Sequence, residues 1–267
     1  MISLDQLYAI RQKIPKFIRR LFPKFHLFQY YFLPTNLKRL PELNYPEKGD
    51  IEYQRDLIKK FQISKKQTSS MTCPHLIELI HMKFNSNDSF YFLDIGGEKI
   101  DFYLNLKNNF KNVKYFLFNQ KSMLNPFREI KDELNLKDLI LVDKIEEISN
   151  NNYDFVNFGS CIQYFNDYEN FLKRITNISK YIFFSGTHLY DNFSNDLSKN
   201  LVVKQVNVLP QTNYLYFFNR ESFFKILLEE NFKIVFEENN LTDKINYDNF
   251  AHNLKNLQYS DFLFEKK

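Results

Sequence analysis

Glycine is scarce in this chain, which has only five glycines among its 267 residues. Two of the five stand side by side, Gly96 and Gly97, directly after the largely apolar segment 90–95. Glycine lets the backbone turn sharply and lets another molecule come close to the main chain. Because the residue is so rare here, the pair predicts a functional turn at the end of a buried strand, although an ordinary strand-to-helix turn is the alternative.

Cysteine is almost absent as well. The chain has two cysteines, Cys73 and Cys161, and they lie far apart in the sequence. A disulfide framework is therefore not indicated, and a reducing cytoplasm is the default expectation. Cys73 is near His75 and His81, but without a second closely spaced pair the spacing is poor for zinc, so we expect no metal site.

No apolar run approaches the ~20 residues that a membrane-spanning helix needs. The longest aromatic stretch, 25–33, is interrupted by His26 and Gln29 and is followed by Pro34. It also lies too far from the start and lacks a small-residue cleavage site, so we expect no signal peptide.

Positive charge is concentrated near the start of the chain. The net charge is +4, but residues 1–40 hold one acid, Asp5, and eight basic residues, which gives +7 there and −3 elsewhere. We expect residues 1–34 to form short helices broken by prolines. Apolar residues recur there at helical spacing, with basic residues between them. We favour packing on the main domain, and contact with the inner membrane is the alternative. The segment is short and its aromatic residues look buried, so we expect no nucleic-acid partner.

From residue 89 onward, apolar segments of strand length alternate with segments of helical pattern. This alternation predicts an α/β fold with a doubly wound, Rossmann-like, mostly parallel sheet of seven strands, whose last strand is reversed. We expect a helical N-terminal extension at 1–88 and the Rossmann-like domain at 89–267. The expected strands are 90–95, 113–118, 138–142, 153–158, 180–185, 232–237 and 259–264, with an additional extended pair at 201–208 and 214–218. The expected helices are 51–63, 74–84, 99–110, 122–135, 167–178 and 220–230, with a short helical turn at 144–149.

The residue types at the glycine turn favour one cofactor class. Nucleotide-like cofactors bind at the carboxyl edge of a parallel sheet. Asp94, an acid at the strand end, suits an amino group or hydroxyls better than a phosphate, which favours S-adenosylmethionine over a dinucleotide. A nicotinamide cofactor is a weaker alternative, because the third glycine is missing and Asn119 stands where an acid is expected after the second strand.

Four segments in this order resemble class I S-adenosylmethionine-dependent methyltransferases, and more narrowly a methyltransferase family encoded among bacterial surface-polysaccharide genes. They are 92–97, 116–120, 154–165 and 205–219. The resemblance implies methyl transfer from S-adenosylmethionine to a hydroxyl of a sugar or glycan precursor. The chain departs from the family pattern at Glu98, Ile100, Asn119 and Ser185-Gly186, which keeps open a second hypothesis, a non-catalytic module that binds a partner in a membrane-bound polysaccharide complex.

The resemblance implies roles for residues that follow the strands. Asp94, Gly96 and Gly97 are expected at the amino-acid part of the cofactor, Asn119 and Gln120 at the ribose, and Asp143 at the adenine amine. Each has a structural alternative, such as an ordinary turn, a solvated loop or a helix start. Gly159 and Ser160 end the fourth strand at the same edge and complete the predicted cofactor site.

A second group of residues is expected at the acceptor. Gln163 and Tyr164 would border the transferring methyl group, and Tyr214 and Tyr216 would form a wall for a sugar ring. His188 follows the fifth strand and is the candidate base, because histidine is the commonest general base. Packing in the core is the alternative for the tyrosines and for His188.

Overall fold

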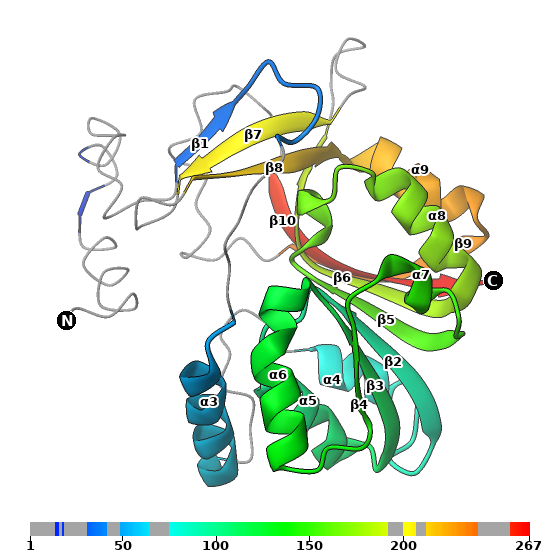
Figure 1. Cartoon of the computed structure of the whole chain (residues 1–267). Coiled ribbons are helices and arrows are strands. Elements are labelled where there is room, and N and C mark those ends of the chain that lie inside the picture. Colours follow the sequence, from blue (N-terminus) through cyan, green and yellow to red (C-terminus); the bar gives the residue numbers. More distant parts are fainter. Residues whose placement is uncertain are drawn as a thin grey trace.

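A computed structural model describes residues 14, 15, 18, 31–41, 49–64, 75–191, 200–206, 212–239 and 257–267. Seven strands form the central part of its sheet (Figure 1). In spatial order they are β4 (Leu139–Val142), β3 (Asn112–Phe118), β2 (Ser89–Ile95), β5 (Tyr153–Gly159), β6 (Ser179–Tyr190), β10 (Gln258–Lys266) and β9 (Phe232–Asn239). The first five pair in parallel, whereas β10 is antiparallel to both β6 and β9. The predicted fold class, with a reversed last strand, is therefore confirmed.

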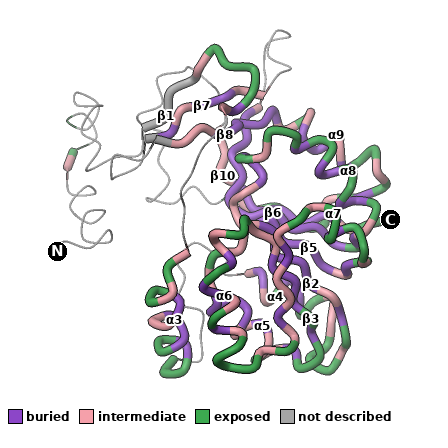
Figure 2. The backbone as a smooth tube through the Cα atoms, viewed as in Figure 1, coloured by how far each residue is buried: buried purple, intermediate pink, exposed green. Residues whose placement is uncertain are grey.

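Helices cover both faces of this sheet (Figure 1). One face packs against α3 (Ile51–Ser64), α4 (Leu76–His81), α5 (Ile100–Asn109) and α6 (Lys121–Glu133), and the other against α7 (Ile145–Ile148), α8 (Tyr168–Ile178) and α9 (Arg220–Glu229). A parallel sheet covered on both faces needs apolar side chains on both, which explains the nearly continuous apolar strands of the sequence. Phe92, Leu93 and Ile95 of β2 are accordingly all buried, and the buried part of the backbone runs through the centre of the molecule (Figure 2).

Three further strands extend the sheet beyond the predicted seven. The predicted extended pair is present as β7 (Leu201–Val206) and β8 (Thr212–Asn219), which are antiparallel, and β1 (Tyr31–Pro34) pairs with β7. β8 joins the sheet through the far end of β6, at Leu189 and Tyr190. The prediction of short helices over 1–34 was wrong for residues 31–34, and the prediction of a strand ending at 185 was wrong as well. Both segments gain strand partners that are distant in sequence.

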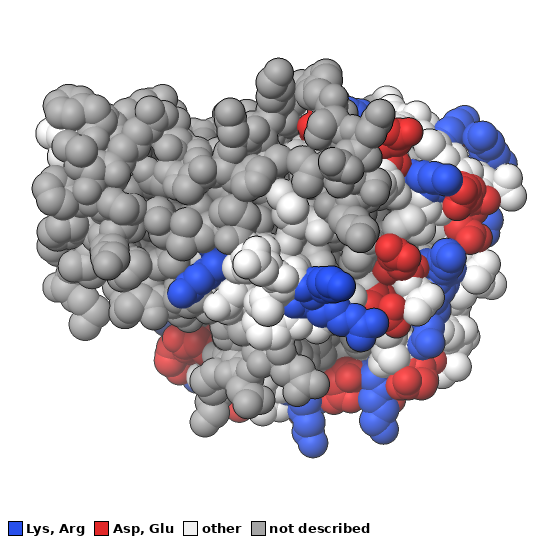
Figure 3. Space-filling view, turned by 90° about the horizontal axis from the view of Figure 1, so that it is seen from above, with Lys and Arg blue, Asp and Glu red and all other residues white. Residues whose placement is uncertain are grey.

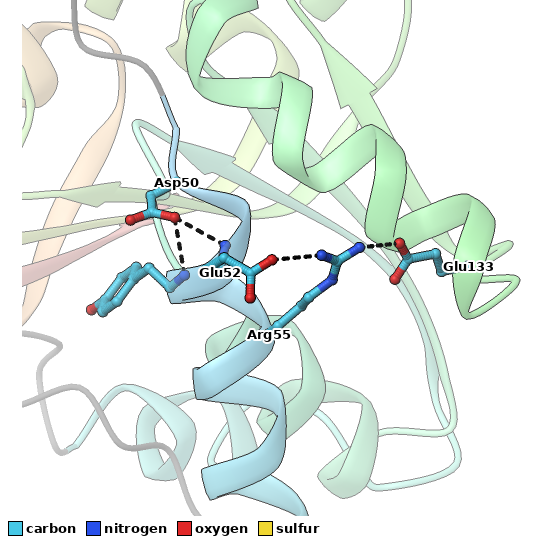
Figure 4. A network of polar contacts seen from close by, with 5 residues as sticks. Asp50, Glu52, Arg55 and Glu133 are labelled. Carbon is cyan, nitrogen blue, oxygen red and sulfur yellow. Dashed lines mark hydrogen bonds and ion pairs between the residues drawn. The ribbon is translucent and has the colours of Figure 1, made fainter.

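The region before the glycine turn is tied to the main sheet through α3. Asp50 caps this helix, with Oδ1 accepting from the backbone N–H of Glu52 at 2.9 Å and of Tyr53 at 3.2 Å (Figure 4). The Arg55 guanidinium pairs with Glu52 and with Glu133 at the end of α6 (Figure 4). α3 therefore packs on the helices of the sheet, and the division at residue 88 stays a prediction.

Most of residues 1–30 lie outside the described residues, so the choice between packing and membrane contact stays open there. Within the described ranges, no helix combines the length and the apolarity that crossing a membrane requires. Seen from above, the described surface carries acidic and basic side chains near one another, without a field of one sign (Figure 3).

Candidate functional site

A cavity of about 570 Å³ lies at the carboxyl ends of β2, β3, β4 and β5. Its position is the edge at which open α/β sheets bind ligands, and its volume suits a small molecule. The described residues that line it are Leu40, Pro41, Gly96, Glu98, Phe118, Asn119, Gln120, Met123, Asp143, Cys161, Tyr164, Phe165, Asn166 and Asn213. Among the predicted site residues, the cavity brings together Gly96, Asn119, Gln120, Asp143 and Tyr164.

Gly96 makes the tight turn at the end of β2. Its φ of +76° lies in the region that only glycine adopts without strain. A Cβ at this position would lie 2.7 Å from Cys161 Cβ, so the loop after β5 closes on the turn. The Gly96 N–H also donates to the carbonyl of Phe118 at 2.8 Å. The turn is therefore fixed against β3 on one side and against the β5 loop on the other.

Asp94 lies beneath the turn and does not line the cavity. Its carboxylate is 4 % exposed and accepts hydrogen bonds from the hydroxyl of Tyr115 and from Asn157 Nδ2, the latter at 2.7 Å. Burial raises the pKa of Asp94 to about 6, against the lowering effect of these two hydrogen bonds. A Cβ on Gly97 would lie 2.1 Å from Asp94 Oδ2, so this glycine is needed to cover the carboxylate.

The side chain of Asn119 braces the same turn from the end of β3. Its Nδ2 donates to the carbonyl of Gly97 at 3.0 Å, and its Oδ1 accepts from the backbone N–H of Gln120 at 2.8 Å. An aspartate could not donate the first of these bonds. Asn119 departs from the family pattern, and its amide is therefore needed to hold the turn. Its neighbour Gln120 is exposed at the cavity.

Asp143 follows β4 and is held by an ion pair that sequence reasoning missed. Nη2 of Arg128, on α6, lies 2.7 Å from Asp143 Oδ2. Nη1 of Arg128 donates to Asn125 Oδ1 at 2.8 Å, which fixes the guanidinium. The pair joins a helix to a strand end, so no local pattern could have revealed it.

Gly159 ends β5, and Ser160 and Gln163 follow it, but none of the three lines the cavity. Ser160 has a φ of +56°, and its N–H donates to the carbonyl of Ser185 at 3.0 Å. Gln163 is 2 % exposed, and its Nε2 donates to the carbonyl of Ser160 at 2.7 Å. These residues link β5 to β6 and support the loop that carries Cys161.

The three predicted acceptor tyrosines have different surroundings. Tyr164 is 39 % exposed at the cavity, and its hydroxyl donates to Gln205 Oε1 at 3.3 Å. Tyr216 is 5 % exposed in the core, and Tyr214 packs against the same core, so neither lines the cavity. Their neighbour Asn213 lines it instead.

His188 lies away from the cavity, in the extended end of β6. Its ring is 4 % exposed and stacks on Phe217 with 4.9 Å between ring centroids. Burial lowers the pKa of His188 to about 3, so the imidazole is neutral at physiological pH. The structure thus gives this histidine a packing role rather than the position of a base.

One wall of the cavity comes from the N-terminal region. Leu40 and Pro41 line it, and Asn166 holds Leu40 in both directions. Asn166 Oδ1 accepts from the Leu40 N–H at 2.8 Å, and Asn166 Nδ2 donates to the Leu40 carbonyl at 3.0 Å. These contacts span 126 positions, and nothing in either local sequence signals them.

Metal ligands do not gather anywhere in the described part of the chain, where no group of three or more His, Cys, Asp or Glu side chains could hold an ion. Cys73, which is close to His75 and His81 in the sequence, lies outside the described residues.

Neither a protein-family model nor a curated protein matches the sequence. Solved structures do match. The N-terminal domain of EvdMO1, crystallised in the presence of S-adenosylhomocysteine and D-fucose, aligns with a TM-score of 0.53 and 11 % identity over 81 % of this chain and 96 % of its own. An S-adenosylmethionine-dependent methyltransferase from Clostridium acetobutylicum aligns with a TM-score of 0.50 and 14 % identity over 81 % and 99 %.

The 1,6-didemethyltoxoflavin-N1-methyltransferase of Burkholderia thailandensis, crystallised with bound 1,6-didemethyltoxoflavin and S-adenosylhomocysteine, also aligns. Its TM-score is 0.50 and its identity 12 %, over 88 % of this chain and 99 % of its own. At such low identity the likeness concerns the fold, and function has to be argued from the site. The chain therefore shares the fold of these solved structures, two of which are methyltransferases.

Proposed function

We propose that the protein is an S-adenosylmethionine-dependent methyltransferase that methylates a hydroxyl of a sugar or glycan precursor. The observation that carries this proposal is the convergence of the Gly96 turn, the Asn119-Gln120 amides and the Asp143 carboxylate on one cavity. These groups come from the ends of three neighbouring parallel strands, β2, β3 and β4.

The chemistry of the lining fits the parts of this cofactor. The Asp143 carboxylate can accept from an adenine amine, and Phe118 and Met123 offer apolar surface for a base. Gln120 can bind ribose hydroxyls through its exposed amide. The turn at Gly96 would receive the amino-acid part. The adenine amine, the ribose hydroxyls and the aromatic base of the cofactor are thus each matched by a group in the cavity.

The bound cofactor would supply a methyl group that its sulfonium makes electrophilic. The work of the chain is to orient the acceptor hydroxyl toward that carbon and to keep water away. Tyr164 and Phe165 border the cavity after β5, and Leu40 and Pro41 close it from the N-terminal side. His188 is not part of this proposal, because it is buried outside the cavity.

A sugar acceptor is supported by three observations. The sequence resembles a family encoded among surface-polysaccharide genes, and the EvdMO1 domain was crystallised with D-fucose in addition to S-adenosylhomocysteine. The cavity also presents a hydroxyl from Tyr164 and an amide from Asn213, groups that hydrogen-bond sugar hydroxyls.

A non-catalytic binding module is the second candidate. The observation that favours it is Glu98, a cavity residue where the family has a glycine. Asn119 and Ser185-Gly186 also depart from the family pattern, but they do not favour a non-catalytic module. Asn119 braces the glycine turn, and Ser185-Gly186 lies within strand β6.

Calorimetric titration with S-adenosylhomocysteine tests the proposal. We expect micromolar binding by the wild type and about tenfold weaker binding by Asp143→Asn, because the amide loses a charged acceptor. The matched control is Asp138→Asn, whose aspartate also pairs with one basic side chain but does not line the cavity. Binding should then be followed by transfer of a labelled methyl group to a panel of sugars and nucleotide sugars. Absence of binding up to millimolar cofactor would overturn the proposal.

A further inference from the structure

Two carboxylates lie close to the glycine turn, and only one of them belongs to the cavity. Asp94 is buried, and its oxygens accept from Tyr115 and Asn157 inside the core. Glu98 is exposed and lines the cavity. Any ligand that reaches the turn therefore meets the charge of Glu98 before that of Asp94.

The backbone that carries Glu98 is fixed from the N-terminal region. Gln54 of α3 is 3 % exposed, its Nε2 donates to the Glu98 carbonyl at 2.6 Å, and its Oε1 accepts from the Ile100 N–H at 2.9 Å. One side-chain amide thus holds both sides of the segment in which the family pattern has further glycines. A carboxylate presented from a fixed backbone loses less freedom on binding than one on a mobile loop.

The charge of Glu98 also acts at the inner end of the cavity. The pKa of the Cys161 thiol is raised well above its usual value, mainly by burial and then by the charges of Asp94 and Glu98. Cys161 contacts the turn itself, since its Cβ occupies the space that a Cβ on Gly96 would need. Two carboxylates, those of Asp94 and Glu98, therefore lie near the turn, and carboxylates suit a cationic group.

We propose that Glu98 binds the α-amino group of the cofactor's amino-acid part and so selects an adenosyl amino acid over a simple adenosine thioether. The inference rests on the proposed function. It assigns to Glu98 the role that the family resemblance gives to Asp94, and it makes Gln54 a positioning residue for that interaction.

A structural role for the Glu98 charge would have a different signature. Glu98 lies just before α5, where a negative charge stabilises the helix dipole. Loss of that effect would destabilise the free protein and its complexes with either ligand by the same amount. It would therefore not distinguish one adenosine ligand from another.

The experiment compares two ligands by calorimetry with the full chain. S-adenosylhomocysteine has the amino-acid part, whereas 5′-deoxy-5′-methylthioadenosine keeps the adenosine and the thioether without it. For Glu98→Gln we expect about tenfold weaker binding of S-adenosylhomocysteine, with less than about twofold change for the thioether. The control is Glu221→Gln, which removes an exposed glutamate in the first turn of another helix. Gln54→Ala should shift the same ligand ratio in the same direction.

The possible outcomes separate this inference from the proposed function. If Glu98→Gln binds both ligands as tightly as the wild type, or loses affinity for both by the same factor, the role assigned to Glu98 is overturned. The methyltransferase proposal would still stand. Tighter binding in the variant would overturn the role of Glu98 too, because it would mean that Glu98 obstructs the site. Absence of wild-type binding to S-adenosylhomocysteine would remove the proposed function and this inference together. If Glu98→Gln does not fold, Glu98→Ala, which also removes the charge, provides the same comparison.

Discussion

The side-chain amide of Asn119 donates to the carbonyl oxygen of Gly97 at 3.0 Å, and so connects the end of β3 to the glycine turn after β2. In the family that the sequence resembles, an acid stands at this position and holds ribose hydroxyls. Here the bond needs a donor, which a carboxylate lacks. The departure is therefore adapted to the turn of this chain.

Asn119→Asp, which restores the family residue, should weaken the protein. It would place a carboxylate oxygen near the Gly97 carbonyl oxygen and lose a hydrogen bond, which costs ~1–3 kcal/mol. Urea unfolding measures the stability, and calorimetry measures the affinity for S-adenosylhomocysteine. Asn125→Asp is the matched control, because its Oδ1 accepts from Arg128 and an aspartate would keep that bond. A more stable or tighter-binding Asn119→Asp protein would refute the bracing role.

Gly96 and Gly159 end neighbouring strands, but only Gly96 should be intolerant of a side chain. Gly96→Ala places a Cβ 2.7 Å from Cys161 Cβ at a φ of +76°, and we expect a loss of ~1–3 kcal/mol in the free energy of unfolding. Gly159→Ala meets its nearest atom, Asn157 Nδ2, at 3.6 Å, an ordinary contact, and should change stability by less than ~0.5 kcal/mol. Equal effects of the two substitutions in urea unfolding would contradict this account.

The core strands could be predicted closely from the sequence. A strand at 90–95 is expected from its apolar run, and β2 spans Ser89–Ile95. Strands buried on both faces have nearly continuous apolar sequences, which makes them easy to locate. β6 was harder, because Ser185-Gly186 resembles a strand end. In the fold, Asp261 Oδ1 accepts from the Gly186 N–H at 2.7 Å, and the strand continues to Tyr190.

The candidate site was predictable where its residues follow the ends of strands. Gly96, Asn119 and Asp143 could be placed in this way, because parallel strands bring their carboxyl ends to one edge. Leu40 and Arg128 carry no such signal, since their site contacts are with Asn166 and Asp143 in other elements. Sequence position alone also put His188 at the same edge, whereas the continuation of β6 buries it.

Asp94 should make stability depend on pH in a direction unusual for an aspartate. Burial raises its pKa to about 6, above the value of about 4 in an unfolded chain. Between these values the folded state binds more protons, so the free energy of unfolding falls as the pH rises. The contribution is complete below about pH 4 and is lost as the pH passes through about 6; it amounts to on the order of 3 kcal/mol.

Asp94→Asn isolates this contribution, because the amide stays uncharged throughout. It should also be accommodated, since Asn157 Oδ1 is buried without a hydrogen-bond partner among the described residues and can accept from the new amide. Urea unfolding from pH 4 to 8 should show the wild type losing stability relative to the variant. Asp138→Asn, at a partly exposed aspartate, controls for a general change of charge. A difference that does not vary with pH would show that Asp94 ionises normally in the fold.

Asn166→Ala should release the N-terminal wall of the cavity. The variant loses both hydrogen bonds to the Leu40 backbone, and hydrogen exchange at the Leu40 amide should become at least about tenfold faster, as expected for a loss of ~1.4 kcal/mol. Asn170→Ala is the control, because this nearby asparagine bonds only to Asp167 among the described contacts, at 2.8 Å.

The consequence for ligand binding follows from the position of the wall. Leu40 and Pro41 face the cavity from outside the sheet, whereas the predicted cofactor groups sit at the strand ends. If the wall retains a bound ligand, Asn166→Ala should raise the dissociation rate of S-adenosylhomocysteine more than it lowers the association rate. The reason is that a looser wall opens without altering the groups at the strand ends. Stopped-flow measurements give both rates. Faster exchange at Leu40 with unchanged dissociation would mean that the wall shapes the cavity without controlling exit from it.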